Sequence, residues 1–229
     1  MSAQKHLQAV LDAERALREA EAALLDEPEK AVVDALESAV KEAKSIEDLD
    51  EATLRLERLA DLCAQVPGPR MADALIAILD HDEPRVRVSA GEALLDVAYD
   101  YYAEVARAID RTLDDGRAVR ALAELPFLLA EVGEPSATPL LRRFLAHPDA
   151  TVVAAAIEAA VELGDPELAS SLESLADDER EVAEEDFEEE TAATLGDLAT
   201  DALEALRGRP EPDGRFDQGL GRAPKGRGR

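Results

Sequence analysis

The stretch VRVSAGEALL (residues 86–95) occurs in related form twice more, as VRALAELPFL (119–128) and VVAAAIEAAV (152–161). The interval between successive copies is 33 residues, and it holds for three sets of apolar positions: Val86, Val119 and Val152; Ala90, Ala123 and Ala156; Leu75, Ala108 and Leu141. Periods of this length are typical of repeat architectures, in which each unit stacks on its neighbours. Each unit contains an apolar segment, a polar turn and an Ala-rich segment, which predicts a pair of helices.

The composition favours helix along the whole chain. The 229 residues include 44 alanines and 32 leucines, which head the scale of helix propensity. Aromatic residues make up 3% and Trp is absent, so the usual anchors of β-sandwiches and of base-stacking surfaces are missing. We therefore expect an all-α fold and exclude all-β and Rossmann-type folds.

The repeat resembles the HEAT repeat, in particular the short bacterial type related to the bilin lyase repeat. The resemblance rests on the pattern Val-Arg-x-x-Ala, followed by a further Ala and Leu, in residues 86–95. It implies an α-solenoid of helical hairpins. It also implies a ladder between repeats made of turn aspartates and helix arginines, here Asp82 with Arg87 and Asp115 with Arg120. In the third unit, Pro148 and Val153 occupy these positions, so both partners are lost together.

The chain divides into three parts. Residues 1–70 are expected to form an N-terminal helical cap or a degenerate repeat. Residues 71–206 are expected to form HEAT-like repeats, with units at 71–100, 103–133, 136–165 and a degenerate 167–206 that contains an acidic insertion at 177–190. Residues 207–229, with six Gly and seven basic residues against three acidic ones, are expected to form a disordered basic tail.

Small and apolar side chains predict how the helices pack. Stacked helices approach closely where one face is small, so five alanines are expected between the layers: Ala90, Ala93, Ala123, Ala156 and Ala159. Pro126 is expected to kink its helix or to restart its last turn. An apolar stripe in the first helix comprises Val10, Ala13, Leu17, Ala20 and Leu24. We expect this helix to belong to the cap, and a dimerising coiled coil is the alternative.

The charge of the chain favours basic partners. With 25 basic and 52 acidic residues the net charge is −27, which repels phosphate backbones and anionic lipids. A basic protein or peptide is the favoured ligand, and the alternative is that the charge only maintains solubility. The run 177–190, which contains ten acidic residues, is interpreted as a solvated insertion or as a docking tract for such a partner.

A binding surface follows from the resemblance, because second helices line the concave face of a HEAT solenoid. The register predicts two acidic rungs that flank an apolar one: Glu92 and Asp96, Leu125 and Leu129, Glu158 and Glu162. The alternative for the two leucines is packing against the neighbouring repeat. All the tyrosines lie together between the first two units, as interface anchors or as packing between layers: Tyr99, Tyr101 and Tyr102.

No residue pattern indicates catalysis. His81 and His147 are 66 residues apart and share one turn position, while His6 stands alone. No set of residues has the spacing of metal ligands, and no phosphate-binding or nucleophile motif occurs. Cys63 lies on an apolar stripe, where a buried and inert thiol is expected. We expect no catalytic residue, no metal and no cofactor.

The sequence thus predicts a non-catalytic adaptor or scaffold that binds a protein on its concave face. A single cysteine, and the absence of an apolar leader or membrane span, predict a cytoplasmic protein, and a monomer is favoured. The ratio of 20 Arg to 5 Lys suggests a GC-rich bacterial genome. One alternative is a nucleic-acid-associated factor that uses the basic tail, and a bilin-lyase-like enzyme is a third.

Overall fold

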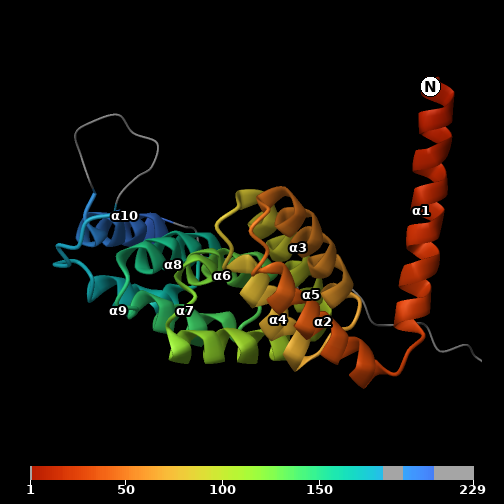
Figure 1. Cartoon of the computed structure of the whole chain (residues 1–229). Coiled ribbons are helices and arrows are strands. Elements are labelled where there is room, and N and C mark those ends of the chain that lie inside the picture. Colours follow the sequence, from red (N-terminus) through yellow and green to blue (C-terminus); the bar gives the residue numbers. More distant parts are fainter. Residues whose placement is uncertain (1, 183–192, 209–229) are drawn as a thin grey trace, which may run out of the picture.

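The computed structural model describes residues 2–182 and 193–208, and these residues form stacked helical hairpins (Figure 1). The expected all-α fold is confirmed: apart from an isolated bridge between Glu181 and Thr194, the regular structure of the described residues is helical. The α-helices are α1 (Ala3–Leu25), α2 (Glu29–Ala43), α3 (Leu49–Ala64), α4 (Pro69–Leu79), α5 (Pro84–Asp115), α6 (Val119–Val132), α7 (Ala137–Leu145), α8 (Ala150–Leu163), α9 (Ala169–Glu173) and α10 (Leu195–Gly208).

The hairpins form two layers. The second helices α3, α6, α8 and α10 and the first half of α5 pack side by side in one layer. The first helices α2, α4 and α7 and the second half of α5 form the other. Leu75, Ala108 and Leu141, one set of the repeated positions, are fully buried, so the period marks the core. Of the five alanines expected between layers, four are buried and Ala123 is partly exposed.

Two expected interruptions have different outcomes in the described helices. Helix α5 consists of two helical halves that meet at a kink at Tyr101, whose φ and ψ are −132° and 40°. This break lies between the first two expected units, although no Gly or Pro occurs between residues 98 and 108. The expected restart at Pro126 is wrong, because α6 continues through it. Buried Leu122 and Leu129 hold the two halves of α6 in the core.

Aspartates in the turns fix several helix starts. Asp149 caps α8, since its Oδ1 accepts a hydrogen bond from the backbone N–H of Thr151 at 2.9 Å. Helix α6 has Ala118 at its N-cap position and so lacks a local acceptor. Asp80 of the preceding repeat supplies one, because its Oδ1 accepts from the N–H groups of Arg120 (3.2 Å) and Ala121 (3.4 Å). This contact links adjacent repeats.

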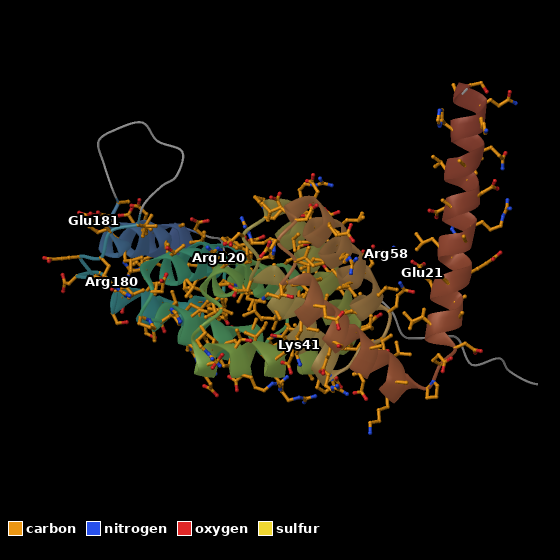
Figure 2. The ribbon with its side chains drawn as sticks, viewed as in Figure 1. Glu21, Lys41, Arg58, Arg120, Arg180 and Glu181 are labelled. Atoms are coloured by element: carbon orange, nitrogen blue, oxygen red, sulfur yellow. The ribbon has the colours of Figure 1, made fainter. Side chains whose placement is uncertain are left out.

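The N-terminal region is only partly a cap. Helices α2 and α3 pack on α4 and α5, and Lys44 Nζ donates to the carbonyl of Ala77 at 2.6 Å. Helix α1 instead projects from the stack (Figure 1) and has no buried residue. The expectation that α1 belongs to the cap is therefore corrected, since its stripe finds no apolar surface along most of its length. Its attachment is at the base, where Leu24 packs on the core and Glu21 faces Arg58 (Figure 2).

The last unit has a single 3-10 turn (Pro166–Leu168) before the short α9. Backbone hydrogen bonds hold the start of the acidic insertion: the N–H of Val182 donates to the carbonyl of Ala193 at 3.2 Å, and the N–H of Leu195 donates to the carbonyl of Arg180 at 2.9 Å. The remainder of the insertion, 183–190, and the basic tail from residue 209 lie outside the described residues.

Candidate functional site

A groove of about 390 Å³ opens between α5, α6 and α8 on the layer of second helices. We call it the second-helix groove. It is lined by Leu79, Pro84, Arg87, Val88, Gly91, Leu95, Glu124, Phe127, Leu128, Glu131 and Glu162.

The floor of this groove is apolar. Val88 is 59% exposed, and Leu95 and Phe127 are partly buried while packing on the core. These side chains come from two adjacent repeats, so the stacking of α5 on α6 assembles them. Contiguous exposed apolar surface is typical of a site that another molecule covers.

The rim of the groove is acidic. Glu124 and Glu131 extend from α6 and Glu162 from α8. Arg87 is the one cation among the lining residues, and it is already engaged: its Nε donates to Glu124 Oε1 at 3.3 Å. Its Nη1 donates to the carbonyls of His81 (3.2 Å) and Asp82 (2.9 Å). The groove therefore presents negative charge around an apolar floor.

The tyrosine cluster reaches this rim through one member. The Tyr99 hydroxyl donates to Glu131 Oε1 at 3.4 Å. Partial desolvation and the Glu131 carboxylate both raise the pKa of Tyr99 above that of an ordinary tyrosine. Tyr101 is exposed, and Tyr102 packs against the core. An anchoring role for Tyr99 and Tyr101 stays a prediction, while Tyr102 packs between elements.

The structure separates the residues expected to form one face. Leu125 and Leu129 are fully buried, so the expected apolar rung is wrong for these two and packing in the core is confirmed. Phe127 and Leu128 of α6 line the groove instead of Leu125 and Leu129. Of the acidic pair on α8, Glu162 lines the groove, and Glu158 is exposed outside it.

The other acidic pair lies in a neighbouring groove of about 480 Å³ between α3 and α5. Glu92 and Asp96 line it together with Asp61 and Asp100. It contains more carboxylates and fewer large apolar side chains than the second-helix groove. The first half of α5 thus separates an apolar groove from an acidic one.

The expected ladder is present with different partners. Asp82 Oδ1 pairs with Arg120 Nη2 at 2.5 Å, which joins two repeats. Arg87 contacts the backbone carbonyl of Asp82 and not its carboxylate. Asp115 pairs with Arg117, at 2.7 Å. The expected ion pairs of Asp82 with Arg87 and of Asp115 with Arg120 are therefore wrong, because Arg120 reaches back to the turn of the previous unit.

A second ladder, which the sequence reasoning missed, crosses the first helices. Arg70 on α4 pairs with Asp34 (2.8 Å) and Glu37 (2.6 Å) on α2, and Arg70 lowers the pKa of Glu37. Arg143 on α7 pairs with Asp110 and Asp114 on α5. The signal was available, since Glu37 with Arg70 and Asp110 with Arg143 each differ by 33. Exposed pairs contribute only about 0–1 kcal/mol each, so their effect is mainly on register.

Comparison with known proteins identifies the repeat. A family model described as HEAT repeats matches residues 114–189, so this segment is similar to HEAT repeats. A solved engineered protein of the Northeast Structural Genomics Consortium is 18% identical, with 82% of this chain and 87% of that chain covered and a TM-score of 0.34. No curated protein matches the sequence. HEAT repeats generally mediate interactions between proteins.

The charge of the helical stack is unevenly compensated. Every arginine in the described part of the chain lies in an ion pair. Because residues 1–206 hold 18 basic and 49 acidic side chains, a large surplus of carboxylates remains. Some of these pairs join adjacent repeats, as Arg120 with Asp82 does, and others lie within one helix, as Arg107 with Glu104 does. The surplus of carboxylates makes the overall field negative.

Two of the histidines and the cysteine have structural positions in the helical stack. The Nδ1 atoms of His81 and His147 each accept a backbone N–H two residues ahead, both at 3.1 Å. Their shared turn position is thus confirmed. Cys63 is fully buried, and burial raises the pKa of its thiol to about 12, so it is a poor nucleophile. Within residues 2–182 and 193–208 no group of three metal-ligating side chains occurs and no helix is long and apolar enough to cross a membrane.

Proposed function

We propose that the chain is a cytoplasmic, non-catalytic adaptor that binds a basic amphipathic segment of a partner protein in the second-helix groove. The observation that supports this most strongly is the apolar floor of Val88, Leu95 and Phe127 beside the carboxylates of Glu131 and Glu162. A helix with apolar residues on one face and cations at its flanks complements both features.

The charge distribution favours a protein ligand over a nucleic acid. A phosphate backbone approaching the groove is repelled by the surplus of negative charge on the chain, whereas Lys and Arg side chains are attracted to it. The function common to HEAT repeats points the same way. The apolar floor adds affinity that charge alone does not provide, because apolar area is removed from water on binding.

A synthetic probe tests the groove directly. The probe is a fluorescent peptide helix with Leu on one face and Lys on the other, and its affinity is measured by fluorescence anisotropy. We expect Glu131→Lys with Glu162→Lys to weaken binding by at least about tenfold, or about 1.4 kcal/mol. Phe127→Ala should weaken it to a similar extent through the lost apolar contact.

The control keeps the charge change and moves it away. Asp201→Lys with Glu204→Lys alters two exposed carboxylates on α10, outside both grooves. This variant should bind nearly as well as the parent. Equal losses in the two double variants would show that the peptide follows net charge only, and would contradict a defined groove.

A third double variant decides between the two grooves. Glu92→Lys with Asp96→Lys removes carboxylates from the groove between α3 and α5, where the sequence placed one acidic rung. We expect a smaller loss than with Glu131→Lys and Glu162→Lys. The opposite ranking would move the binding site to that neighbouring groove.

The natural partner requires capture from the native cell lysate, with the full chain and residues 1–208 as baits. A protein that both baits retain, and that the Glu131→Lys, Glu162→Lys variant loses, supports the adaptor. Nucleic acid retained by the full chain alone would support the alternative function through the basic tail.

A further inference from the structure

Helix α1 exposes an apolar stripe that nothing in the described chain covers. Leu7, Val10 and Leu17 are 60%, 64% and 42% exposed, although each follows the helical spacing that normally faces a core. The helix has no buried residue, and its contacts with the stack are at the base, through Glu21 and Leu24. Helices obtain most of their stability from tertiary packing of such a face.

We propose that α1 pairs in antiparallel orientation with α1 of a second copy of this chain. One register fits the stripe to itself. When Arg15 lies at the level of the two-fold axis, Val10 lies opposite Ala20 of the second copy, and Leu17 lies opposite Ala13. Val10 and Leu17 then each face an alanine, and the symmetry repeats both contacts, which allows the two helices to approach closely.

The charge of α1 agrees with a copy of itself as partner. Residues 3–25 carry three basic and four acidic side chains, whereas residues 26–206 carry 15 and 45. Any other surface of the described stack therefore attracts a basic partner, while α1 is nearly neutral and repels its copy little. Two ion pairs within α1, Arg18 with Glu14 and Arg15 with Asp12, balance the charges near its centre.

The same charges select the antiparallel orientation. A helix of 23 residues is about 35 Å long, and antiparallel pairing places the two acidic stacks near its opposite ends. Screening in salt of physiological strength acts over about 8 Å, so the stacks then repel each other weakly. A parallel pair would bring the two stacks together at one end of the helices.

The experiment measures the mass of the full chain in solution against concentration, by sedimentation equilibrium. The parent should form a dimer, and Val10→Glu with Leu17→Glu should raise the dissociation constant by at least about 100-fold. Leu54→Glu on α3, which changes a leucine that is 63% exposed, is the matched control and should leave the dimer intact. A parent that stays monomeric at all concentrations, or a dimer that the double variant retains, would overturn the proposal.

Disulfide trapping tests the orientation. A mixture of the Val10→Cys and Ala20→Cys variants should crosslink as a heterodimer, because these positions face each other across the antiparallel pair. Val10→Cys alone should crosslink poorly, and efficient crosslinking with itself would show a parallel pair and refute the arrangement. Buried Cys63 does not compete under native conditions.

Salt distinguishes this contact from the groove. Dimerisation through α1 should strengthen with salt, because screening reduces repulsion between the acidic stacks, whereas binding of a basic peptide should weaken. Weakening of the dimer by salt would contradict an apolar α1 contact. The two proposals are independent, since neither groove contains a residue of α1.

Discussion

The turn between α4 and α5 and the turn between α7 and α8 share one hydrogen-bond pattern, but a different arginine donates in each. In both, a histidine Nδ1 accepts a backbone N–H, and two backbone carbonyls accept from one arginine Nη1. In the first turn the donor is Arg87, at the start of the following helix. In the second turn Val153 holds that position and is buried, and the donor is Arg180, 33 residues beyond the turn.

The comparison shows that the requirement belongs to the carbonyls and not to a position in the repeat. Buried or partly buried carbonyls need donors, and Arg180 reaches the carbonyls of His147 at 3.1 Å and Pro148 at 2.8 Å from the far side of α9. Asp178 holds it through hydrogen bonds of 2.6 Å to Nη2 and 3.0 Å to Nε. As a result, the last repeat is connected to the third one.

The largest loss of stability should come from Gly196→Ala, which changes the contact between α10 and the segment that leads to Arg180. A Cβ at this position would lie 2.6 Å from the carbonyl oxygen of Ala176 and 3.2 Å from that of Asp178. Both are backbone atoms of the segment that leads to Arg180, so the segment and α10 must separate. We expect a loss of about 3 kcal/mol in the free energy of unfolding, measured by urea denaturation.

Gly91→Ala is the control for that substitution. This glycine lies within α5, and its Cβ would meet only Leu79 Cδ1, at 3.9 Å. Ala is the better helix former by about 1 kcal/mol, so the variant should be at least as stable as the parent. Destabilisation by both variants would indicate a general intolerance of side chains at helix glycines.

The next largest effect is the difference in stability between the Arg180→Ala and Arg87→Ala variants. Arg180 closes a long segment onto another repeat, whereas Arg87 serves its own turn. We expect a loss of about 2 kcal/mol for Arg180→Ala and about 1 kcal/mol for Arg87→Ala, measured by urea denaturation. Hydrogen exchange should also increase in α10 for the first variant and in the α4–α5 turn for the second.

The region in which hydrogen exchange increases distinguishes the role of Arg180 from that of Arg87. If both variants loosened the same region, or if Arg87→Ala had the larger cost, the arginine would not connect the last two repeats. Arg180→Lys is a useful intermediate, since it keeps the charge and loses the planar geometry that reaches Asp178 and two carbonyls together.

The smallest effect concerns pH. Hydrogen bonds from Arg180 lower the pKa of Asp178 below that of an ordinary aspartate, so the unfolded chain binds this proton more readily. The resulting stability is present above a pH of about 4 and is lost as the pH falls through the lower pKa of the folded state. The difference in unfolding free energy between the parent and Arg180→Ala should therefore shrink over this range. A constant difference would argue against the pairing.

The core of the protein could be read from the sequence, because one-dimensional spacing is sufficient there. The 33-residue interval identified the units, and positions such as Leu75 and Leu141 are buried as the period requires. Helix propensity and the two shared histidine turns were also readable. The break at Tyr101 also lies between the first two units that the period defines, although no Gly or Pro marks it.

The lining of the second-helix groove could be read only in part. The register predicted carboxylates on the second helices, and of these Glu162 lines the groove. The register predicted Leu125 at the surface, whereas Phe127 lies there and Leu125 is buried. A shift of two residues along a helix moves a side chain from the core side to the surface. A spacing rule carried from α5 to α6 fails when the two helices rotate relative to one another, and no property of either segment alone reports this rotation.

The all-α repeat, the apolar positions and the excess of negative charge follow from the amino-acid sequence, because helix periodicity and composition are local properties. The arginine that serves the second turn, the side chains that line the groove and the exposure of α1 emerge only when the helices are packed together. These depend on how helices are oriented across repeats, where Asp80, Arg120 and Arg180 reach partners about one repeat away. Such contacts are set by the stacking geometry, which no single repeat encodes.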